Sequence, residues 1–313
     1  MLRATHMRPL FSVVITTYNY GHLVKRAIES VLAQDFLDYE LIVVDDGSTD
    51  DTEKRLVQYS GRLHYIKKEN GGQSSAINVG ARHARGTYIY VLDADDELLP
   101  STFRAFAEAV GRASEDRRGS IFYGGYVSVS QAGEEFERKS RDTPQDPRLA
   151  LRAFLTKKIS GLKNGAFIIP RTAFERISYP EGLHNNTDIV FIGQALTMYR
   201  AINIGSIVLK SHEHSQRTRK QLDRILGAGI RPVEALFDPT IVPADLMPLR
   251  QLHLAHRWRS LARQLYTHGD YNESVRAYRS AFKASPSVMF EFASLRRAFA
   301  AWLKSKRRTS ASE

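Results

Sequence analysis

Short hydrophobic runs alternate with segments of helical period through the first hundred residues. Continuous runs of β-branched and other apolar residues are typical of buried strands, whereas apolar residues that recur every three or four positions indicate amphipathic helices. Strands are predicted at residues 11–17, 40–45, 63–67 and 88–92, and helices at residues 23–33, 52–59 and 74–84. Repeated strand–helix units of this kind predict a parallel sheet with helices on both faces.

Polar clusters follow three of the predicted strands, at residues 16–19, 45–48 and 93–96. The carboxyl ends of parallel strands lie at one edge of a sheet, and open α/β sheets bind ligands beyond that edge. Each cluster taken alone also suits an ordinary turn or helix cap. Because all three are expected at the same edge and contain no basic residue, we interpret them together as a binding site.

Two aspartates separated by one residue, Asp93 and Asp95, can point into one space where a strand breaks into a turn. Oxygen ligands suit Mg²⁺ or Mn²⁺, which complete their coordination with water and phosphate oxygens. The sequence has no cysteine, which excludes a disulfide framework, a thiolate metal site and a cysteine nucleophile. Residues 71–74 lack the lysine of a P-loop, and no GxGxxG follows the first strand, so kinase and dehydrogenase functions lose support.

Three segments resemble the family 2 glycosyltransferases: VVITTYNYGHLVKRAIESVLAQ, ELIVVDDGSTDDT and NGGQSSAINVGARHARGTYIYVLDADD. The three motifs occur in the family's order and spacing, and the resemblance covers residues 11 to about 100. It implies a GT-A fold, with a mostly parallel twisted sheet flanked by helices. It also implies transfer of a sugar from a nucleotide donor with inversion at the anomeric carbon.

The resemblance implies a nucleotide-binding role for the first two clusters. Thr16 and Tyr18 would line the base pocket, with the Tyr18 ring against the pyrimidine. Asp46 would accept the uracil N3–H, which favours uridine donors because cytosine carries no proton there. Asp45 would shape the turn or reach the ribose. Asn78 is also assigned to the donor site.

The third cluster matches the family's DxD motif at residues 93–95. Asp93 would contact the ribose or the sugar, and Ala94 would line the donor site. Asp95 and Asp96 would hold Mn²⁺ or Mg²⁺ against both phosphates. His212 resembles a family histidine that contacts the donor diphosphate or the metal, although an HxH pair with His214 also fits a surface zinc site or simple loop polarity.

The acceptor half of the site matches the family less closely. Gly165 leads a short apolar run that resembles the family's glycine-led strand near the acceptor. Thr187 and Asp188 precede a predicted helix at residues 189–199, where the family has Glu-Asp and uses the Asp as the general base. Asp188 is therefore the predicted base, and Thr187 is placed in the acceptor region. An aspartate at a helix start is also an ordinary cap.

Charge separates the chain into two predicted parts. The whole chain has 45 Lys and Arg against 34 Asp and Glu, a net charge of +11, but residues 245–313 alone have 13 against 5. We predict a catalytic domain at residues 1–244 and a helical extension at residues 245–313. The extension contains a tetratricopeptide-like hairpin that would pack on the catalytic domain or on a second copy. It ends in a basic amphipathic helix that would either dock or lie on an anionic membrane.

The sequence predicts a non-processive enzyme, because Leu254 stands where the QxxRW motif of processive relatives has Gln before Arg257-Trp258. It would move a hexose or N-acetylhexosamine from a UDP-sugar to a glycan or lipid-linked acceptor in surface polysaccharide biosynthesis. Without a signal peptide or an apolar run of about 18 residues, a cytoplasmic location with peripheral contact at the inner membrane face is expected. No nucleic-acid partner is expected. The alternatives are a catalytically impaired scaffold or glycan-binding protein, or a sugar nucleotidylyltransferase, whose GTR loop is absent from the sequence.

Overall fold

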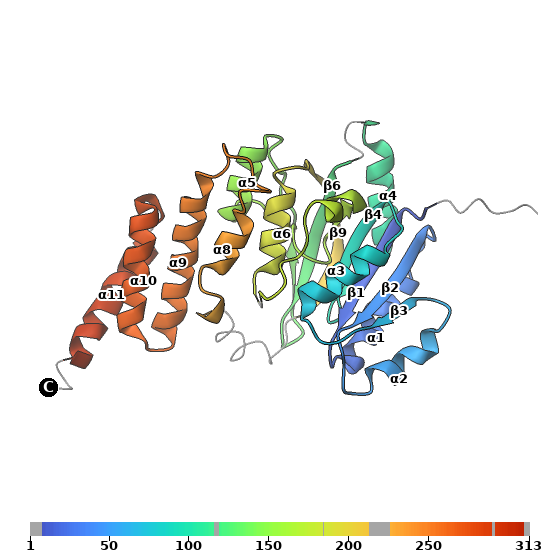
Figure 1. Ribbon diagram of the computed structural model, residues 1–313, viewed down its shortest axis with the longest axis horizontal. Helices are drawn as coiled ribbons and strands as arrows, with labels where there is room; N and C mark the ends of the chain where they lie inside the picture. The colour runs from blue at the N-terminus through green and yellow to red at the C-terminus, as the bar shows by residue number, and fades with distance from the viewer. Residues whose placement is uncertain (1–7, 116–118, 184, 213–225, 290–291, 310–313) are drawn as a thin grey trace, which may run out of the picture. The chain divides into compact units, whose positions relative to one another are not determined.

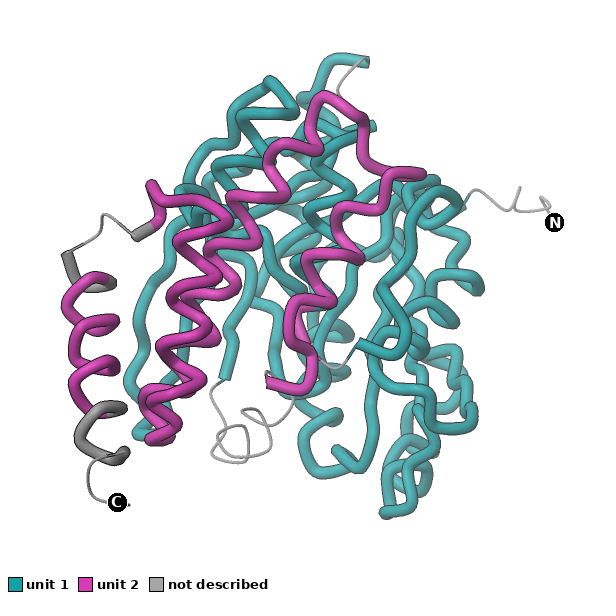
Figure 2. The backbone as a smooth tube through the Cα atoms, turned by 60° about the vertical axis from the view of Figure 1, so that its left-hand side comes forward, with its two compact units in different colours: residues 1–183, 187–215 teal, residues 184–186, 216–313 magenta. Residues whose placement is uncertain are grey.

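The computed structural model describes residues 8–115, 119–183, 185–212, 226–289 and 292–309. The chain divides into two compact units, which Figure 2 shows in different colours. The first unit comprises residues 1–183 and 187–215, and the second comprises residues 184–186 and 216–313. Every residue of the candidate site belongs to the first unit.

A mixed sheet forms the centre of the first unit (Figure 1). Among the described residues it has nine strands, in the order β3-β2-β1-β4-β8-β6-β9-β5, with β7 paired to β6. The bounds are β1 (Phe11–Thr17), β2 (Tyr39–Asp45), β3 (His64–Lys67), β4 (Tyr88–Asp93), β5 (Glu97–Leu98), β6 (Ile121–Val129), β7 (Glu135–Arg138), β8 (Phe167–Pro170) and β9 (Ala201–His212). The first four strands are parallel to one another, as predicted, and β8 joins β4 in the antiparallel sense.

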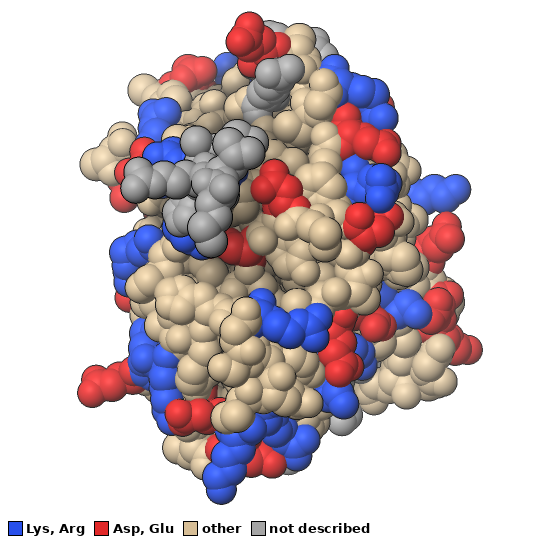
Figure 3. All heavy atoms as spheres, turned by 90° about the vertical axis from the view of Figure 1, so that its right-hand side faces the viewer, with Lys and Arg blue, Asp and Glu red and all other residues tan. Residues whose placement is uncertain are grey.

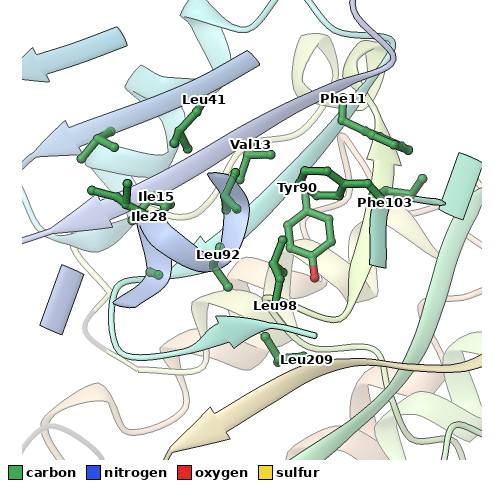
Figure 4. Packing of buried hydrophobic residues seen from close by; sticks show 14 of the residues in the cluster. Phe11, Val13, Ile15, Ile28, Leu41, Tyr90, Leu92, Leu98, Phe103 and Leu209 are labelled. Atoms are coloured by element: carbon green, nitrogen blue, oxygen red, sulfur yellow. The ribbon is translucent and has the colours of Figure 1, made fainter. Parts of the chain in front are cut away.

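Helices cover both faces of the parallel half, which confirms the predicted α/β class. Alternate residues of β1 point to opposite faces. Phe11, Val13 and Ile15 pack with the buried faces of α1 (Gly21–Leu32) and α4 (Thr102–Arg112), and Figure 4 shows part of this core. On the other face lies α3 (Gln73–His83), which approaches so closely that a Cβ on its Gly80 would be 2.4 Å from Val14 Cγ1.

Three predicted elements have different ends in the structure. The helix predicted at residues 52–59 is α2 (Thr52–Leu56) followed by a 3₁₀ turn at Val57–Tyr59. The helix predicted at residues 189–199 is α6 (Thr187–Ala195), which ends in turns where Thr197 Oγ1 bonds to the Gln194 carbonyl. The apolar pattern of residues 201–209 also predicts a strand, and β9 continues beyond it to His212, because β5 pairs with Leu209 and Lys210 and β6 pairs as far as His212. The first unit also contains α5 (Pro147–Leu155) and a 3₁₀ helix at Arg171–Glu175.

The second unit is helical, as expected for the C-terminal region. Its helices are α8 (Arg231–Leu236), α9 (Leu249–Thr267), α10 (Tyr271–Ala284) and α11 (Phe292–Thr309), with a 3₁₀ turn at Pro286–Met289. Small residues let α9 and α10 pack closely around a buried core of Ala262, Ala277, Tyr278 and Ala281. Lys304 of α11 lies 4.7 Å from the Tyr266 ring centroid and 5.1 Å from that of Tyr271. None of the described helices is long and apolar enough to cross a membrane.

Charged side chains on the surface of the first unit form local pairs. Lys67 lies 2.5 Å from Glu53, and Arg104 lies 2.8 Å from Asp35. On the face shown in Figure 3, acidic and basic side chains are interspersed. Exposed pairs of this kind contribute about 0–1 kcal/mol each. They balance surface charge and do little to hold the fold together.

Candidate active site

The polar clusters after β1, β2 and β4 meet at one edge of the sheet, as the sequence predicts. Strand β1 lies between the other two, and the parallel register places Thr16 beside Asp93 and Thr17 beside Asp45. The Asp46 N–H then donates to the Thr17 carbonyl at 2.9 Å. All three strands therefore end at the same edge of the sheet, and the loops that follow them surround a common space.

An acidic cluster forms at the end of β4. Among the described residues, Asp93, Asp95 and Asp96 are a group whose carboxylate oxygens lie within 4.8 Å of one another. The Asp96 N–H donates to the Asp93 carbonyl at 3.1 Å, so the chain turns back here and brings the three side chains together. Asp95 is 6% exposed and Asp96 is 2% exposed. Buried carboxylates this close repel one another unless a cation joins them.

The pKa values of the cluster reflect that repulsion. Burial, together with the charges of Asp96 and Asp95, raises the pKa of Asp93 to about 7. Burial likewise raises the pKa of Asp96. A divalent cation would favour the ionised forms, and hard oxygen ligands of this kind fit Mg²⁺ or Mn²⁺. The donor set therefore matches the predicted metal.

Two basic side chains that the sequence reasoning missed lie at this cluster. Arg26 of α1 donates from Nη2 to the Asp95 carbonyl at 2.5 Å and so holds the turn. Lys163 Nζ lies 2.7 Å from Ser211 Oγ and 3.7 Å from Asp96 Oδ2. In the sequence, Lys163 is 67 residues from Asp96, and the only hint of its position was Gly165 two residues later.

The two aspartates after β2 make different contacts. Asp45 Oδ1 accepts from the Ser48 N–H at 2.8 Å and Oδ2 accepts from the Tyr65 hydroxyl at 2.9 Å, so Asp45 shapes the turn. Asp46 Oδ1 accepts from Lys68 Nζ at 2.7 Å and the Gly71 N–H at 3.0 Å, and its Oδ2 accepts from the Gly72 N–H at 2.7 Å. A carboxylate offers about four acceptor positions, and these three contacts leave one on Oδ2.

The loop after β1 is tied to the loop after β2 by Asn19, another residue that the sequence reasoning did not use. Its N–H donates to Ser48 Oγ at 2.9 Å, and its Oδ1 accepts from the Thr49 N–H at 2.9 Å. Asn19 has φ 54°, a left-handed conformation that asparagine tolerates better than most residues. Tyr18 next to it is 46% exposed, whereas Thr16 is buried. The Tyr18 ring is thus accessible for stacking on a base.

Asn78 and Ala94, two further residues predicted at the donor site, are also buried. Asn78 Nδ2 donates to the Tyr179 carbonyl at 2.9 Å and to Glu181 Oε1 at 3.1 Å, and its Oδ1 accepts from the Tyr179 N–H at 2.9 Å. In this structure Asn78 therefore fastens residues 179–181 to α3. Ala94 is buried between the cluster's aspartates.

His212 lies at the end of β9, beside the acidic cluster. Its N–H donates to Asp96 Oδ1 at 3.1 Å, and its ring Nε2 lies 2.9 Å from Glu97 Oε1. The ring therefore pairs with Glu97 in this structure, and the three-aspartate group forms without it. His214 lies outside the described residues.

The predicted base, Asp188, stands in the first turn of α6, directly after Thr187. Burial raises the pKa of Asp188, while the hydrogen bond from the Ile189 backbone and the charge of Lys163 lower it. The charge of Asp188 in turn raises the pKa of Asp93, so the two carboxyls interact through space. The α6 helix is fixed by Phe191, whose ring stacks on Tyr179 at 4.3 Å.

Gly165 lies in the segment that leads into β8. Its N–H donates to the Val91 carbonyl at 2.7 Å, which ties the segment before β8 to β4. It has φ 78°, and a Cβ at this position would be 2.7 Å from Leu209 Cδ1. Glycine is therefore required here both by conformation and by the close approach of β9.

Comparison with known proteins identifies relatives over the region that carries these clusters. The model of "Glycosyl transferase family 2" matches residues 12–178. An uncharacterized glycosyltransferase of Rickettsia felis is 31% identical over 218 residues, 68% of this chain and 36% of that protein. The MG025 homolog of Mycoplasma pneumoniae, also an uncharacterized glycosyltransferase, is 36% identical over 269 residues, 78% of this chain and 86% of that protein. The chain spans only about a third of the length of the Rickettsia felis protein, and the same is true of a similar uncharacterized glycosyltransferase of Rickettsia conorii.

Solved structures with the same fold include two proteins with bound nucleotide sugars. TarS 1–349 of S. aureus, in complex with UDP-GlcNAc, matches with a TM-score of 0.57 at 19% identity, over 88% of this chain and 91% of that chain. The mannosyltransferase PcManGT of Pyrobaculum calidifontis, in complex with GDP-Man and Mn²⁺, matches with a TM-score of 0.55 at 19% identity, over 98% of this chain and 81% of that chain. At this identity the similarity shows the fold alone, and it confirms the GT-A expectation.

Proposed function

Because the chain belongs to glycosyl transferase family 2, we propose that it transfers a hexose or N-acetylhexosamine from a UDP-sugar to an acceptor hydroxyl, with inversion and one sugar per encounter. The acidic cluster supports this proposal most strongly, because it gathers oxygen ligands for a cation and one of its carboxyls, Asp93, interacts electrostatically with Asp188. The acceptor is a glycan or lipid-linked sugar, and the role is surface polysaccharide synthesis at the cytoplasmic face of the membrane.

In the proposed mechanism each cluster has one task. Tyr18 stacks on the uracil, and the free position on Asp46 Oδ2 accepts the uracil N3–H. Asp93 contacts the ribose or the sugar. Asp188 takes the proton from the acceptor hydroxyl as that oxygen attacks the anomeric carbon from the face opposite the diphosphate. Base catalysis of this kind contributes about 10²- to 10⁴-fold.

Asp95 and Asp96 would hold Mn²⁺ or Mg²⁺, with His212 as a further candidate ligand. The fit rests on oxygen donors within 4.8 Å of one another and on the mutual repulsion of their charges. When bound, the cation would stabilise the negative charge that develops on the leaving diphosphate. To ligate it, the His212 ring would have to leave Glu97.

Titration calorimetry with UDP, dTDP, GDP and CMP, each with Mn²⁺ and again with excess chelator, tests the donor half of this function. UDP is expected to bind in the presence of Mn²⁺ and at least about tenfold more weakly with chelator, because Asp95 and Asp96 would hold a cation that offsets the charge of the diphosphate. CMP is expected to bind more weakly than UDP, since it lacks both a base N3–H and the second phosphate.

The outcomes separate the proposal from its alternatives. Binding of UDP followed by hydrolysis or transfer of the sugar supports the enzyme. Binding without any turnover of UDP-sugars would indicate a scaffold or glycan-binding protein. Pyrophosphate release from a nucleoside triphosphate and a sugar phosphate would indicate a nucleotidylyltransferase. Absence of nucleotide binding in every condition would contradict the proposal.

For the C-terminal helix α11, the proposed partner is an anionic membrane. Phe299 is 60% exposed and Trp302 is 40% exposed, and Leu295 and Leu303 on the same face are also exposed. Arg296 and Lys304 flank these residues, and the sequence continues with Lys306, Arg307 and Arg308. Apolar side chains among cations suit an anionic lipid surface. A second copy would instead bring like charges together, so a membrane fits better than a homo-oligomer.

Replacing Phe299 and Trp302 together with serine is expected to reduce binding to phosphatidylserine-containing vesicles at least about tenfold. The two aromatic side chains supply most of the insertable apolar area of this helix. Co-sedimentation of the full chain with anionic and with neutral vesicles measures the effect. Phe282→Ser is the matched control, since Phe282 is an exposed aromatic residue of α10. Equal sedimentation of the double variant and the wild type would reject the membrane contact.

A further inference from the structure

Lys163 is held at the acidic cluster mainly by groups other than the carboxylates. Its Nζ donates to Ser211 Oγ at 2.7 Å and lies 4.8 Å from the centre of the Tyr126 ring. The distance to Asp96 Oδ2, 3.7 Å, is too long for a strong hydrogen bond. Ser211 and Tyr126 thus fix the ammonium in place while Asp96 remains available to a metal ion.

The charge of Lys163 acts on both halves of the site. It lowers the pKa of Asp93, of Asp96 and of Asp188. Its side chain is 29% exposed, so the ammonium is neither sealed in the core nor free in solvent. The ammonium of Lys163 is therefore close enough to act electrostatically on both the donor carboxylates and the candidate base.

The charge count at the cluster favours further positive charge beside a metal ion. Asp93, Asp95, Asp96 and Asp188 carry four negative charges when ionised, and a divalent ion offsets only two. The diphosphate of a nucleotide sugar adds two more negative charges. An ammonium with three N–H groups can keep its bond to Ser211 and still donate to a phosphate oxygen.

We propose that Lys163 is a second cationic ligand of the donor, binding the diphosphate from the side of the acceptor while the metal ion binds it from the side of Asp95. The inference rests on the proposed function and adds one residue to it. The contacts with Ser211 and Tyr126 keep Lys163 at the site before the donor arrives. A cation held by Asp96 would offset the charge of that carboxylate and would leave the Lys163 ammonium to pair with a phosphate oxygen.

This role predicts effects of opposite sign on two affinities. Lys163→Met is expected to weaken UDP binding in Mn²⁺ about 10- to 100-fold, the effect of losing one charged hydrogen bond. The same variant is expected to bind Mn²⁺ alone at least about threefold more tightly, because a positive charge beside the metal site has been removed. Calorimetry measures the UDP affinity, and electron paramagnetic resonance of free Mn²⁺ measures the metal affinity without nucleotide.

Lys67→Met is the matched control, because Lys67 is also paired with a carboxylate, Glu53 at 2.5 Å, but lies outside the acidic cluster. Both affinities are expected to remain unchanged in it. Lys163→Arg, which retains the charge, is expected to recover most of the UDP affinity. Thermal unfolding of each variant verifies that the fold is retained.

Two results would overturn the role of Lys163 while leaving the proposed function intact. One is unchanged UDP affinity in Lys163→Met beside a wild type that binds UDP. The other is a parallel fall in Mn²⁺ and UDP affinity, which would show that Lys163 merely holds Asp96 in position. A wild type that binds no UDP would overturn the proposed function and this role together.

Discussion

Asp188→Asn is expected to lower sugar transfer by at least about 10²-fold and to leave UDP affinity within about threefold of the wild type. The amide has nearly the same shape as the carboxylate but cannot take the acceptor proton. Asp188 stands at the start of α6, outside the DxD turn, and is assigned no donor contact, so the donor contacts are expected to persist. Single-turnover transfer and calorimetry measure the two quantities separately.

The pH profile provides a second readout for the same variant. Burial raises the pKa of Asp188, and a carboxyl acts as a base only when ionised. Wild-type transfer is therefore expected to fall as the pH drops through this raised pKa, at a higher pH than for an ordinary aspartate. In Asp188→Asn the residual transfer rate is expected to show no such fall at low pH.

Asp146→Asn is the control that separates catalysis from helix capping. Asp146 precedes α5, and its Oδ1 accepts from the Leu149 N–H at 2.8 Å. Asparagine caps helices about as well as aspartate. We expect unchanged transfer and stability in Asp146→Asn. Full transfer activity in Asp188→Asn would remove Asp188 from the mechanism and leave it as a cap of α6.

Asp95→Asn is expected to abolish the Mn²⁺-dependent part of UDP binding and to lower transfer by about 10²- to 10⁴-fold. The cation contributes several kcal/mol to stabilising charge on the leaving group, and each 1.36 kcal/mol corresponds to about tenfold in rate. The Asp95 backbone still accepts from Arg26, so the turn is expected to persist. Titration of UDP with Mn²⁺ and with chelator should then give the same affinity.

The matched control is Asp51→Asn, which removes an exposed aspartate paired with Arg55 at 2.9 Å. Metal-dependent UDP binding is expected to be the same as in the wild type. If Asp95→Asn still bound UDP more tightly with Mn²⁺ than with chelator, the metal would have to be held elsewhere, and the assignment of the DxD turn would be wrong.

The parallel half of the site could be predicted from the sequence because its chemistry is local. Thr17, Asp45 and Asp93 each end a buried strand, and neighbouring parallel strands end at one edge. The alternation of strands and helices was enough to bring them together. The roles assigned to individual residues at that edge remain predictions.

The remaining contacts of the site could not be predicted, because they join residues that are distant in the sequence. Lys163 reaches Asp96 only because residues 161–166 are tied to β4 and Ser211 lies on β9. Asp46 has most of its acceptor positions filled by Lys68 and the Gly71 and Gly72 N–H groups, which no spacing rule indicates. Likewise the partner of the His212 ring, Glu97, lies 115 residues earlier.

The order of the strands also bears on how the protein is made. During synthesis the parallel strands and all three polar loops leave the ribosome within the first hundred residues. Strand β8, which pairs with β4, and strand β9, which carries Ser211, follow much later. Until then three crowded carboxylates have no lysine beside them, and the edge of β4 is open. A nascent chain is thus exposed to mispairing at β4 until about residue 170 emerges.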